Sequence, residues 1–221
     1  MNKKNKTIWE TRIKGKTAKT FQKVSSSINI DKRLFREDIQ ASIAHVEMLN
    51  KQKIINIKVK NKIIWGLKKI QNQIIKKKYS FNYADEDIHM SIEKKLFEII
   101  GEDAGYIHTA RSRNDQVLVD FKIWMNHSNG KLIKLLNLTI NNILKIAEKN
   151  IYTIMPGFTH LKNAQPISFA HYILAYVEMF RRDKKRLENN FSSLKENPLG
   201  SGALSGTSFN IDRNFTTKKL G

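Results

Sequence analysis

The chain contains no cysteine and only three prolines among its 221 residues. The absence of cysteine excludes disulfide bonds, thiolate nucleophiles and cysteine metal ligands. The first proline is Pro156, so no proline interrupts a helix in the first two thirds of the chain.

Long apolar runs are also missing, since none approaches the ~18 residues needed to span a bilayer. The N-terminal segment, residues 1–16, is basic but has no apolar core, so it does not resemble a secretory signal. We therefore predict neither a membrane span nor export, and expect a cytoplasmic protein. A length of 221 residues allows one large or two small domains, each with its own core.

Acidic residues are scarce, because 20 Asp and Glu stand against 40 Lys and Arg, giving a formal net charge of +20. A nucleic-acid partner is one interpretation, but the basic residues are 31 lysines and 9 arginines, whereas base readout favours arginine. Lysine, isoleucine and asparagine are together what an AT-rich coding sequence supplies by drift. Ten of the lysines fall between Lys51 and Lys78 and alternate with an apolar stripe, which is typical of a solvated helix face. We therefore expect scattered lysines and no nucleic-acid partner.

Apolar residues recur at helical spacing along nearly the whole chain, which predicts an all-α protein. Three acids, residues 85–87, and then Gly101 mark the start and the end of one helix. No convincing run of alternating strand residues appears, apart from short extended candidates such as Lys53–Val59. The three apolar stripes before residue 101 are Leu34, Phe35, Ile39, Ile43, Val46 and Leu49; Ile63, Leu67, Ile70 and Ile74; and Ile88, Ile92, Leu96 and Ile99.

Two much longer helices follow. From Asn114 the apolar pattern predicts a helix of about 35 residues, with Gly130 as a candidate kink. Pro156 and Gly157 mark a turn, and Pro166 is placed to open the next helix, whose heptad-like stripe continues to Leu194. We therefore predict a small N-terminal helical domain, residues 1–111, followed by the start of a long-helix bundle, residues 112–221.

Several polar stretches could carry chemistry. "HTARSRNDQ", residues 108–116, precedes the first long helix, where a helix N-terminus and two arginines suit an anion. A helix cap with salt bridges to a neighbouring helix explains the same residues equally well. Thr159 and His160 lie in a loop, where function or simple capping are both possible. "DEDIH", residues 85–89, is weak evidence for a metal, and the glycines of residues 200–206 miss the dinucleotide spacing.

Five segments occur in one order along the chain: "SSSINIDKRLF" (25–35), "DEDIHMSIEKKL" (85–96), "HTARSRNDQVLVDFKIW" (108–124), "PGFTHLKNAQPISFAHYILAYVEMF" (156–180) and "PLGSGALSGTSFNIDR" (198–213). Their order and spacing resemble the argininosuccinate lyase family of the fumarase/aspartase superfamily. "HTARSRNDQ" in particular resembles this family more than adenylosuccinate lyase, fumarase or aspartase. One departure is Lys162, where the family usually has glutamine.

The resemblance implies an elimination that converts argininosuccinate to arginine and fumarate, in arginine biosynthesis, without a metal or an organic cofactor. It implies that Ser27, Asn114 and Thr159 bind substrate and that His160 takes part in proton transfer, directly or by positioning another group. Further implied roles are a carboxylate contact for Arg113 and supporting roles for Asp87 and His89. The family's tetramer assembles each active site from three subunits.

The resemblance covers only the N-terminal half of the family pattern. The family's flexible loop, Gly-Ser-Ser-x-x-Pro-x-Lys-x-Asn, contains the serine assigned to proton transfer, and this chain has no such motif. We expect that the isolated chain, as a truncated or fragmentary product, does not cleave substrate unless a complementary C-terminal fragment supplies that loop. The alternative is a non-catalytic helical protein that keeps the fold for structure or association.

Overall fold

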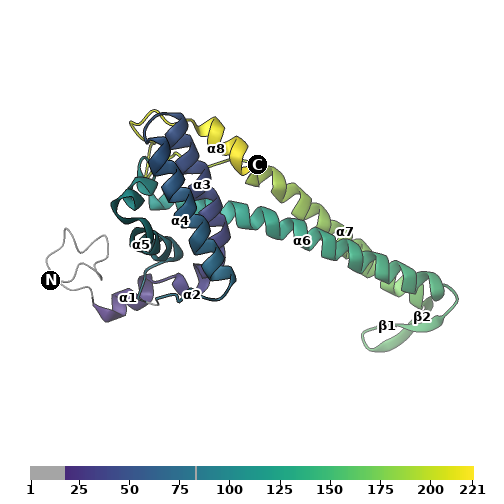
Figure 1. Ribbon diagram of the computed structural model, residues 1–221. Coiled ribbons are helices and arrows are strands. Elements are labelled where there is room, and N and C mark those ends of the chain that lie inside the picture. The colour runs from purple at the N-terminus through teal and green to yellow at the C-terminus, as the bar shows by residue number, and fades with distance from the viewer. Residues whose placement is uncertain (1–17, 83) are drawn as a thin grey trace. The chain divides into compact units, whose positions relative to one another are not determined.

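The computed structural model describes residues 18–82 and 84–221, and its regular structure is almost entirely helical (Figure 1). Residues 1–16, on which we judged the lack of a secretory signal, lie outside the described residues. No helix in the described ranges combines the length and the hydropathy that a membrane span needs. In chain order the elements are α1 (Lys19–Ser25), α2 (Ile28–Asp31), the 3-10 helix η3 (Lys32–Leu34), α3 (Phe35–Lys51), α4 (Ile57–Ile75), α5 (Ile88–Ile100), the 3-10 helix η4 (Gly101–His108), α6 (Arg113–Lys149), β1 (Ile154–Thr159), β2 (Lys162–Ser168), α7 (Phe169–Leu194) and α8 (Arg213–Leu220).

The chain divides into two compact units. Of the described residues, we call those up to 121 together with 197–221 the core unit, and residues 122–196 the hairpin unit. The first turns of α6 belong to the core unit and the rest of that helix to the hairpin unit. The domain boundary at 111/112 that the sequence suggests stays a prediction.

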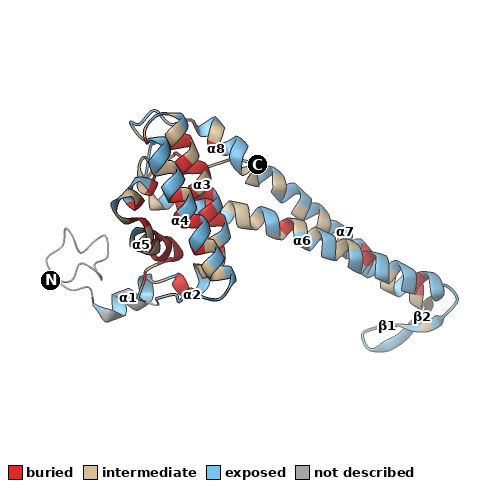
Figure 2. Cartoon of the chain, in the orientation of Figure 1, coloured by how far each residue is buried: buried red, intermediate tan, exposed pale blue. Residues whose placement is uncertain are grey.

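The core unit is built on α3, α4 and α5, whose buried faces carry the three stripes seen in the sequence (Figure 2). Their ends follow local chemistry, because the Asn56 side chain accepts from the Val59 N–H at 2.9 Å and begins α4. Asp87 caps α5 in the same way, accepting from the Met90 N–H at 2.6 Å, and Gly101 ends it with a φ of 73°. The expected start and end of this helix are confirmed.

The hairpin unit contains the two long helices. α6 runs for 37 residues and continues through Gly130, which confirms a helix of about the predicted length. α7 begins three residues later than Pro166 suggested, because Ser168 is its N-cap and accepts from the His171 N–H at 3.1 Å. Pro166 instead lies in β2, so its assignment to a helix start was wrong.

Between these helices lies an antiparallel β-hairpin that the sequence did not predict. β1 pairs with β2 from Ile154 opposite Ser168 to Thr159 opposite Lys162, with an irregularity between Pro156 and Phe158. Both strands of the hairpin are mostly exposed. Neither strand therefore has a buried face, and the sequence shows no alternation of apolar and polar residues of the kind that indicates a half-buried strand. The extended candidate Lys53–Val59 was wrong, because a turn there leads directly into α4.

Candidate functional site

The first two of the five segments meet in the core unit. The Ser27 backbone N–H donates to the Glu86 carbonyl at 2.8 Å, and the Ile88 N–H donates to Asp31 Oδ1 at 3.2 Å. The Ser27 hydroxyl itself is exposed and donates to Asp31 Oδ2 at 2.5 Å. These contacts hold Ser27 beside the N-terminus of α5, where Asp87 and His89 also lie.

Arg113, the first residue of α6, connects the second segment to the third. Its Nε lies 3.3 Å from Asp87 Oδ2, and its two terminal nitrogens donate to Glu93 of α5 at 3.2 and 3.3 Å. Burial opposes ionisation of Glu93, but the His108 hydrogen bond and the charges of Arg113 and Arg111 lower its pKa. Arg113 is thus paired with two carboxylates, as in the salt-bridge interpretation left open above, and its contact with a substrate carboxylate stays a prediction.

Asp115 joins the third segment to the fifth. It is buried; its Oδ1 accepts from the Ser112 N–H at 2.9 Å, and its Oδ2 accepts from the N–H groups of Gly200 and Gly202 at 3.0 and 2.8 Å. Asn114 is exposed, and its side-chain amide donates to the Ala203 carbonyl at 3.2 Å. The loop of residues 198–206 is therefore fastened to the N-terminus of α6 at the position of Asn114.

The backbone before α6 holds a sparsely populated conformation. Ala110 has a φ of 59°, in the left-handed region that residues with a side chain rarely adopt. Next to it the Thr109 carbonyl contacts the buried His45 Nε2 at 2.8 Å, and the Arg111 guanidinium donates to Ser42 Oγ at 2.9 Å. Tertiary contacts with α3 thus keep a strained loop in place, as is common where a loop carries function.

His89 is buried behind this loop rather than exposed to a ligand. Its Nδ1 lies 2.9 Å from Asp38 Oδ1 and 3.4 Å from Asp120 Oδ2. Although burial opposes ionisation, the charge and hydrogen bond of His89, with Arg111 and Gln116, lower the pKa of Asp38. Burial and then the negative charge of Asp38 raise the pKa of Asp120 well above its ordinary range. His89 is therefore placed to support the fold behind the site, and its supporting role in chemistry stays a prediction.

Among the described residues, Asp38, His89 and Asp120 form the group that could hold a metal ion, since their ligand atoms lie within 4.8 Å of one another. Protein donors already serve Asp38, however, whereas the Asp120 oxygens have no hydrogen-bond partner among the described residues. Asp38 Oδ1 contacts both the His89 ring nitrogen and the Gln116 amide, and the Arg111 charge acts on both aspartates. We therefore interpret the cluster as a hydrogen-bonded charge network.

Thr159 and His160 lie at the tip of the β-hairpin in the hairpin unit, and both are exposed. His160 and Leu161 form the two-residue turn between the paired Thr159 and Lys162, with φ values of 50° and 63°. Two positive φ angles are the signature of a type I′ turn, which normally takes Asn or Gly. His160 is therefore an exposed side chain on a strained turn, and its part in proton transfer stays a prediction.

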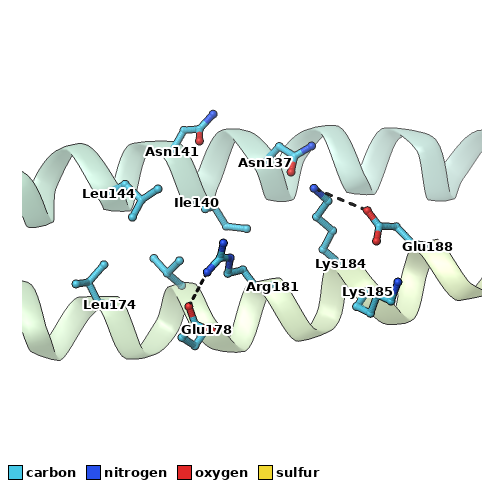
Figure 3. A pocket seen from close by; sticks show the side chains of 11 residues that line it. Asn137, Ile140, Asn141, Leu144, Leu174, Glu178, Arg181, Lys184, Lys185 and Glu188 are labelled. Carbon is cyan, nitrogen blue, oxygen red and sulfur yellow. Dashed lines mark hydrogen bonds and ion pairs between the residues drawn. The ribbon is translucent and has the colours of Figure 1, made fainter.

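Two surface hollows contain none of the predicted site residues. A groove of about 630 Å³ runs between α6 and α7 and is lined by Ile140, Leu144, Leu174 and Val177 and by charged residues of α7. Figure 3 shows ten of its lining residues with labels. A second hollow of about 440 Å³ lies on α4 and includes four of the ten lysines between Lys51 and Lys78. It is lined by Trp65, Lys68, Lys69, Asn72, Gln73, Lys76 and Lys78.

The sequence did not single out several residues that organise the site, namely Asp38, Glu93, Asp115 and Gln116. Three of them are polar side chains buried in the structure, and their partners are distant in sequence. The available signal was a place in the first turn of a helix, where an acid is favoured, and it applies to Asp115 of α6 and Asp38 of α3.

The chain is similar in sequence to curated argininosuccinate lyases of bacteria. The chain is 65% identical over 220 residues to an argininosuccinate lyase of Pelagibacter ubique, which covers 100% of this chain and 48% of that protein. It is 46% identical over 213 residues to an argininosuccinate lyase of Caldicellulosiruptor saccharolyticus, covering 96% and 46% of the two chains. The chain thus spans about half the length of these curated relatives.

Solved structures agree on the fold. An EDDS lyase variant with bound fumarate superposes with a TM-score of 0.75 at 25% identity, covering 92% of this chain and 40% of that one. A fumarate lyase from Brucella melitensis, bound to cobalt, gives a TM-score of 0.71 at 17% identity over 89% of this chain and 46% of that one. The predicted all-α fold class is confirmed. Because the lyase family model matches residues 11–221, nearly the entire sequence, the chain belongs to the lyase family.

Proposed function

We propose that this chain forms the N-terminal part of an argininosuccinate lyase. The observation that carries the proposal is the 65% identity over the whole chain to the Pelagibacter argininosuccinate lyase. The reaction is a β-elimination in which a proton leaves the succinate carbon next to the C–N bond, the C–N bond breaks, and arginine and fumarate separate.

In this proposal Ser27, Asn114 and Thr159 bind the substrate's polar groups. The hydroxyl of Ser27 and the amide of Asn114 are exposed on the core unit, each beside the N-terminus of a helix. Backbone N–H groups at helix N-termini favour anions, which suits a substrate with three carboxylates. Arg113 adds a guanidinium at the first turn of α6, with Asp87 and His89 supporting it from α5.

His160 takes part in proton transfer. Its exposed position in the hairpin turn suits a residue that completes a site with groups from elsewhere, because nothing within the hairpin encloses it. The family's serine loop is not among these 221 residues, so in this proposal residues outside them supply it. The active form is then an oligomer, in which residues of several subunits meet.

The test is fumarate release from argininosuccinate, followed by ultraviolet absorbance. The purified chain is assayed alone and after mixing with the C-terminal half of the Pelagibacter relative, which bears the serine loop in this proposal. We expect no fumarate from the chain alone and release from the mixture. A soluble complex that contains both polypeptides but releases no fumarate would overturn the proposal. Turnover of argininosuccinate by the chain alone would overturn it as well.

A matched pair of histidine variants sharpens this assay. His160→Asn should lower the rate of the mixture roughly 10²- to 10⁴-fold, the usual contribution of a proton-transfer residue. His171→Asn, which changes another exposed histidine of the hairpin unit, is the control and should stay within about twofold of the unsubstituted rate.

A further inference from the structure

We propose that Asp38 is a positioning residue for Arg113, acting through the side-chain amide of Gln116. The inference rests on the proposed function, because it concerns the group that would meet a substrate carboxylate at the start of α6. It assigns a role to two buried residues, Asp38 and Gln116.

Asp38 lies on α3 and is the centre of the buried contacts. Its Oδ1 accepts from the Gln116 amide at 2.6 Å and lies 2.9 Å from the His89 ring nitrogen. The side chain is 1% exposed. Because burial would otherwise favour the neutral acid, the surrounding donors are what keep the pKa of Asp38 low and the carboxylate ionised.

The Gln116 amide links the Asp38 carboxylate to the Arg113 guanidinium. Its amide nitrogen faces the Asp38 carboxylate, and its amide oxygen accepts from Arg113 Nη1 at 3.0 Å. A flip of the amide would place its oxygen against an anion and its NH₂ group against a cation. The charge of Asp38 therefore selects the one orientation in which Gln116 can accept from Arg113.

In this proposal the orientation of the Arg113 guanidinium depends on the Gln116 amide oxygen. The other partners of the guanidinium are Asp87, the N-cap of α5, and Glu93 on α5, so Gln116 is the partner that ties the guanidinium to its own helix. The Arg113 side chain keeps 23% of its surface exposed, so it can still be approached. Displacement of such a group by about 1 Å is enough to impair a bound substrate's alignment.

Asp120 provides a contrast within the same cluster. It is completely buried on α6, and neither carboxylate oxygen meets hydrogen-bond geometry within the described residues. Burial and then the charge of Asp38 raise its pKa well above its ordinary range. Asp120→Asn keeps the size of the side chain and changes another buried member of the same cluster, which makes it a matched control.

The experiment follows the Arg113 side-chain N–H groups by ¹⁵N nuclear magnetic resonance in the full chain, with assignment by Arg113→Lys. We expect Asp38→Asn and Gln116→Met each to speed hydrogen exchange of Arg113 Nε–H roughly ten- to a hundredfold, as loss of an ordered charged hydrogen-bond network implies. Asp120→Asn should leave that rate within about twofold. Backbone amides of α4 in the same samples report whether a variant has merely loosened the fold.

Gln116→Met keeps Asp38 paired with His89, so it serves if Asp38→Asn does not fold. This readout needs no fumarate, and therefore separates failure of the positioning role from failure of the proposed reaction. In the complemented enzyme the same two variants should raise KM more than they lower kcat. Wild-type exchange at Arg113 in both variants, or an equal change in Asp120→Asn, would overturn the proposal.

Discussion

The core unit and the hairpin unit are made of similar amphipathic helices but bury them to very different extents. In the core unit a contiguous cluster of apolar side chains from α2 to η4 is buried. In the hairpin unit only four apolar side chains are buried, namely Ile140, Ala147, Ala170 and Val177. The exposed large apolar side chains of the hairpin unit are Leu132, Leu135, Leu138, Leu144, Ile146, Ile151, Tyr152, Ile154, Phe158, Leu161, Tyr172, Leu174, Tyr176 and Met179.

The difference teaches that a helical pattern determines a helix but not what covers it. Two helices can cover only part of each other's apolar stripes, whereas three or more enclose a core. Exposed apolar surface of this extent marks a site of association in soluble proteins. The hairpin unit therefore fits the proposed oligomeric lyase, in which further helices cover these side chains.

The largest expected effect comes from two leucine truncations, one in the core unit and one in the hairpin unit. Leu67→Ala removes a fully buried side chain of α4 and should cost about 2–5 kcal/mol of unfolding free energy. Leu135→Ala, at a leucine of α6 that is 58% exposed, should change it by less than about 0.5 kcal/mol. Urea unfolding followed by circular dichroism measures both. Equal costs would mean that the exposed face of α6 is covered in solution.

A smaller effect concerns pH, and it belongs to the core unit. Burial first, and then the nearby charge of Arg111, lower the pKa of His45 from 6.5 to about 3. The unfolded chain then binds this proton below pH 6.5 while the folded chain does not, so stability is full above pH 6.5 and is lost as pH falls towards 3. Between pH 6.5 and 5 the wild type should lose roughly 1.6 kcal/mol relative to His45→Gln, because the slope of about 1.4 kcal/mol per pH unit is reached only below the unfolded pKa.

Urea midpoints at several pH values measure that difference. His171→Gln, on α7 of the hairpin unit, is the control and should follow the wild type in parallel. The carboxyl of Asp120 acts in the opposite direction, because its raised pKa makes its contribution complete below pH 3.8 and weaker as pH rises. For this reason the contribution of His45 is read from the difference between the wild type and His45→Gln, and not from the pH dependence of the wild type alone.

The smallest effect compares two glycines inside helices. A methyl group on Gly66 of α4 would come within 2.5 Å of Leu96 Cδ1 and 3.1 Å of Ile100 Cγ2, whereas one on Gly130 of α6 meets nothing within 4 Å. Gly66→Ala should destabilise the chain by about 1 kcal/mol, because close packing between α4 and α5 outweighs the gain in helix propensity. Gly130→Ala should stabilise it by about 0.5–1 kcal/mol. Thermal unfolding measures both, and a loss in Gly130→Ala would reveal a hidden contact on α6.

Much of the helical framework could be predicted from the sequence. The spacing of Ile63, Leu67 and Ile70, or the acids before Ile88, specifies a helix from neighbours within a few residues. The hairpin at His160 and Leu161 escaped prediction, because its strands are mostly exposed and its turn lacks the usual Asn or Gly. Family motifs identified Ser27, Asn114, Thr159 and His160 as candidates, and their roles remain predictions.

The sequence by itself determined the helices, the fold class and the candidate site residues, because each depends on local periodicity or on a short motif. Only the tertiary structure decided which polar side chains become buried partners. Asp38 and Gln116 are 78 positions apart and are joined by a 2.6 Å hydrogen bond, while Asp115 reaches Gly200 across 85. Such pairs form because packing of the helices removes these groups from water, and a buried donor or acceptor must then find its partner inside the protein.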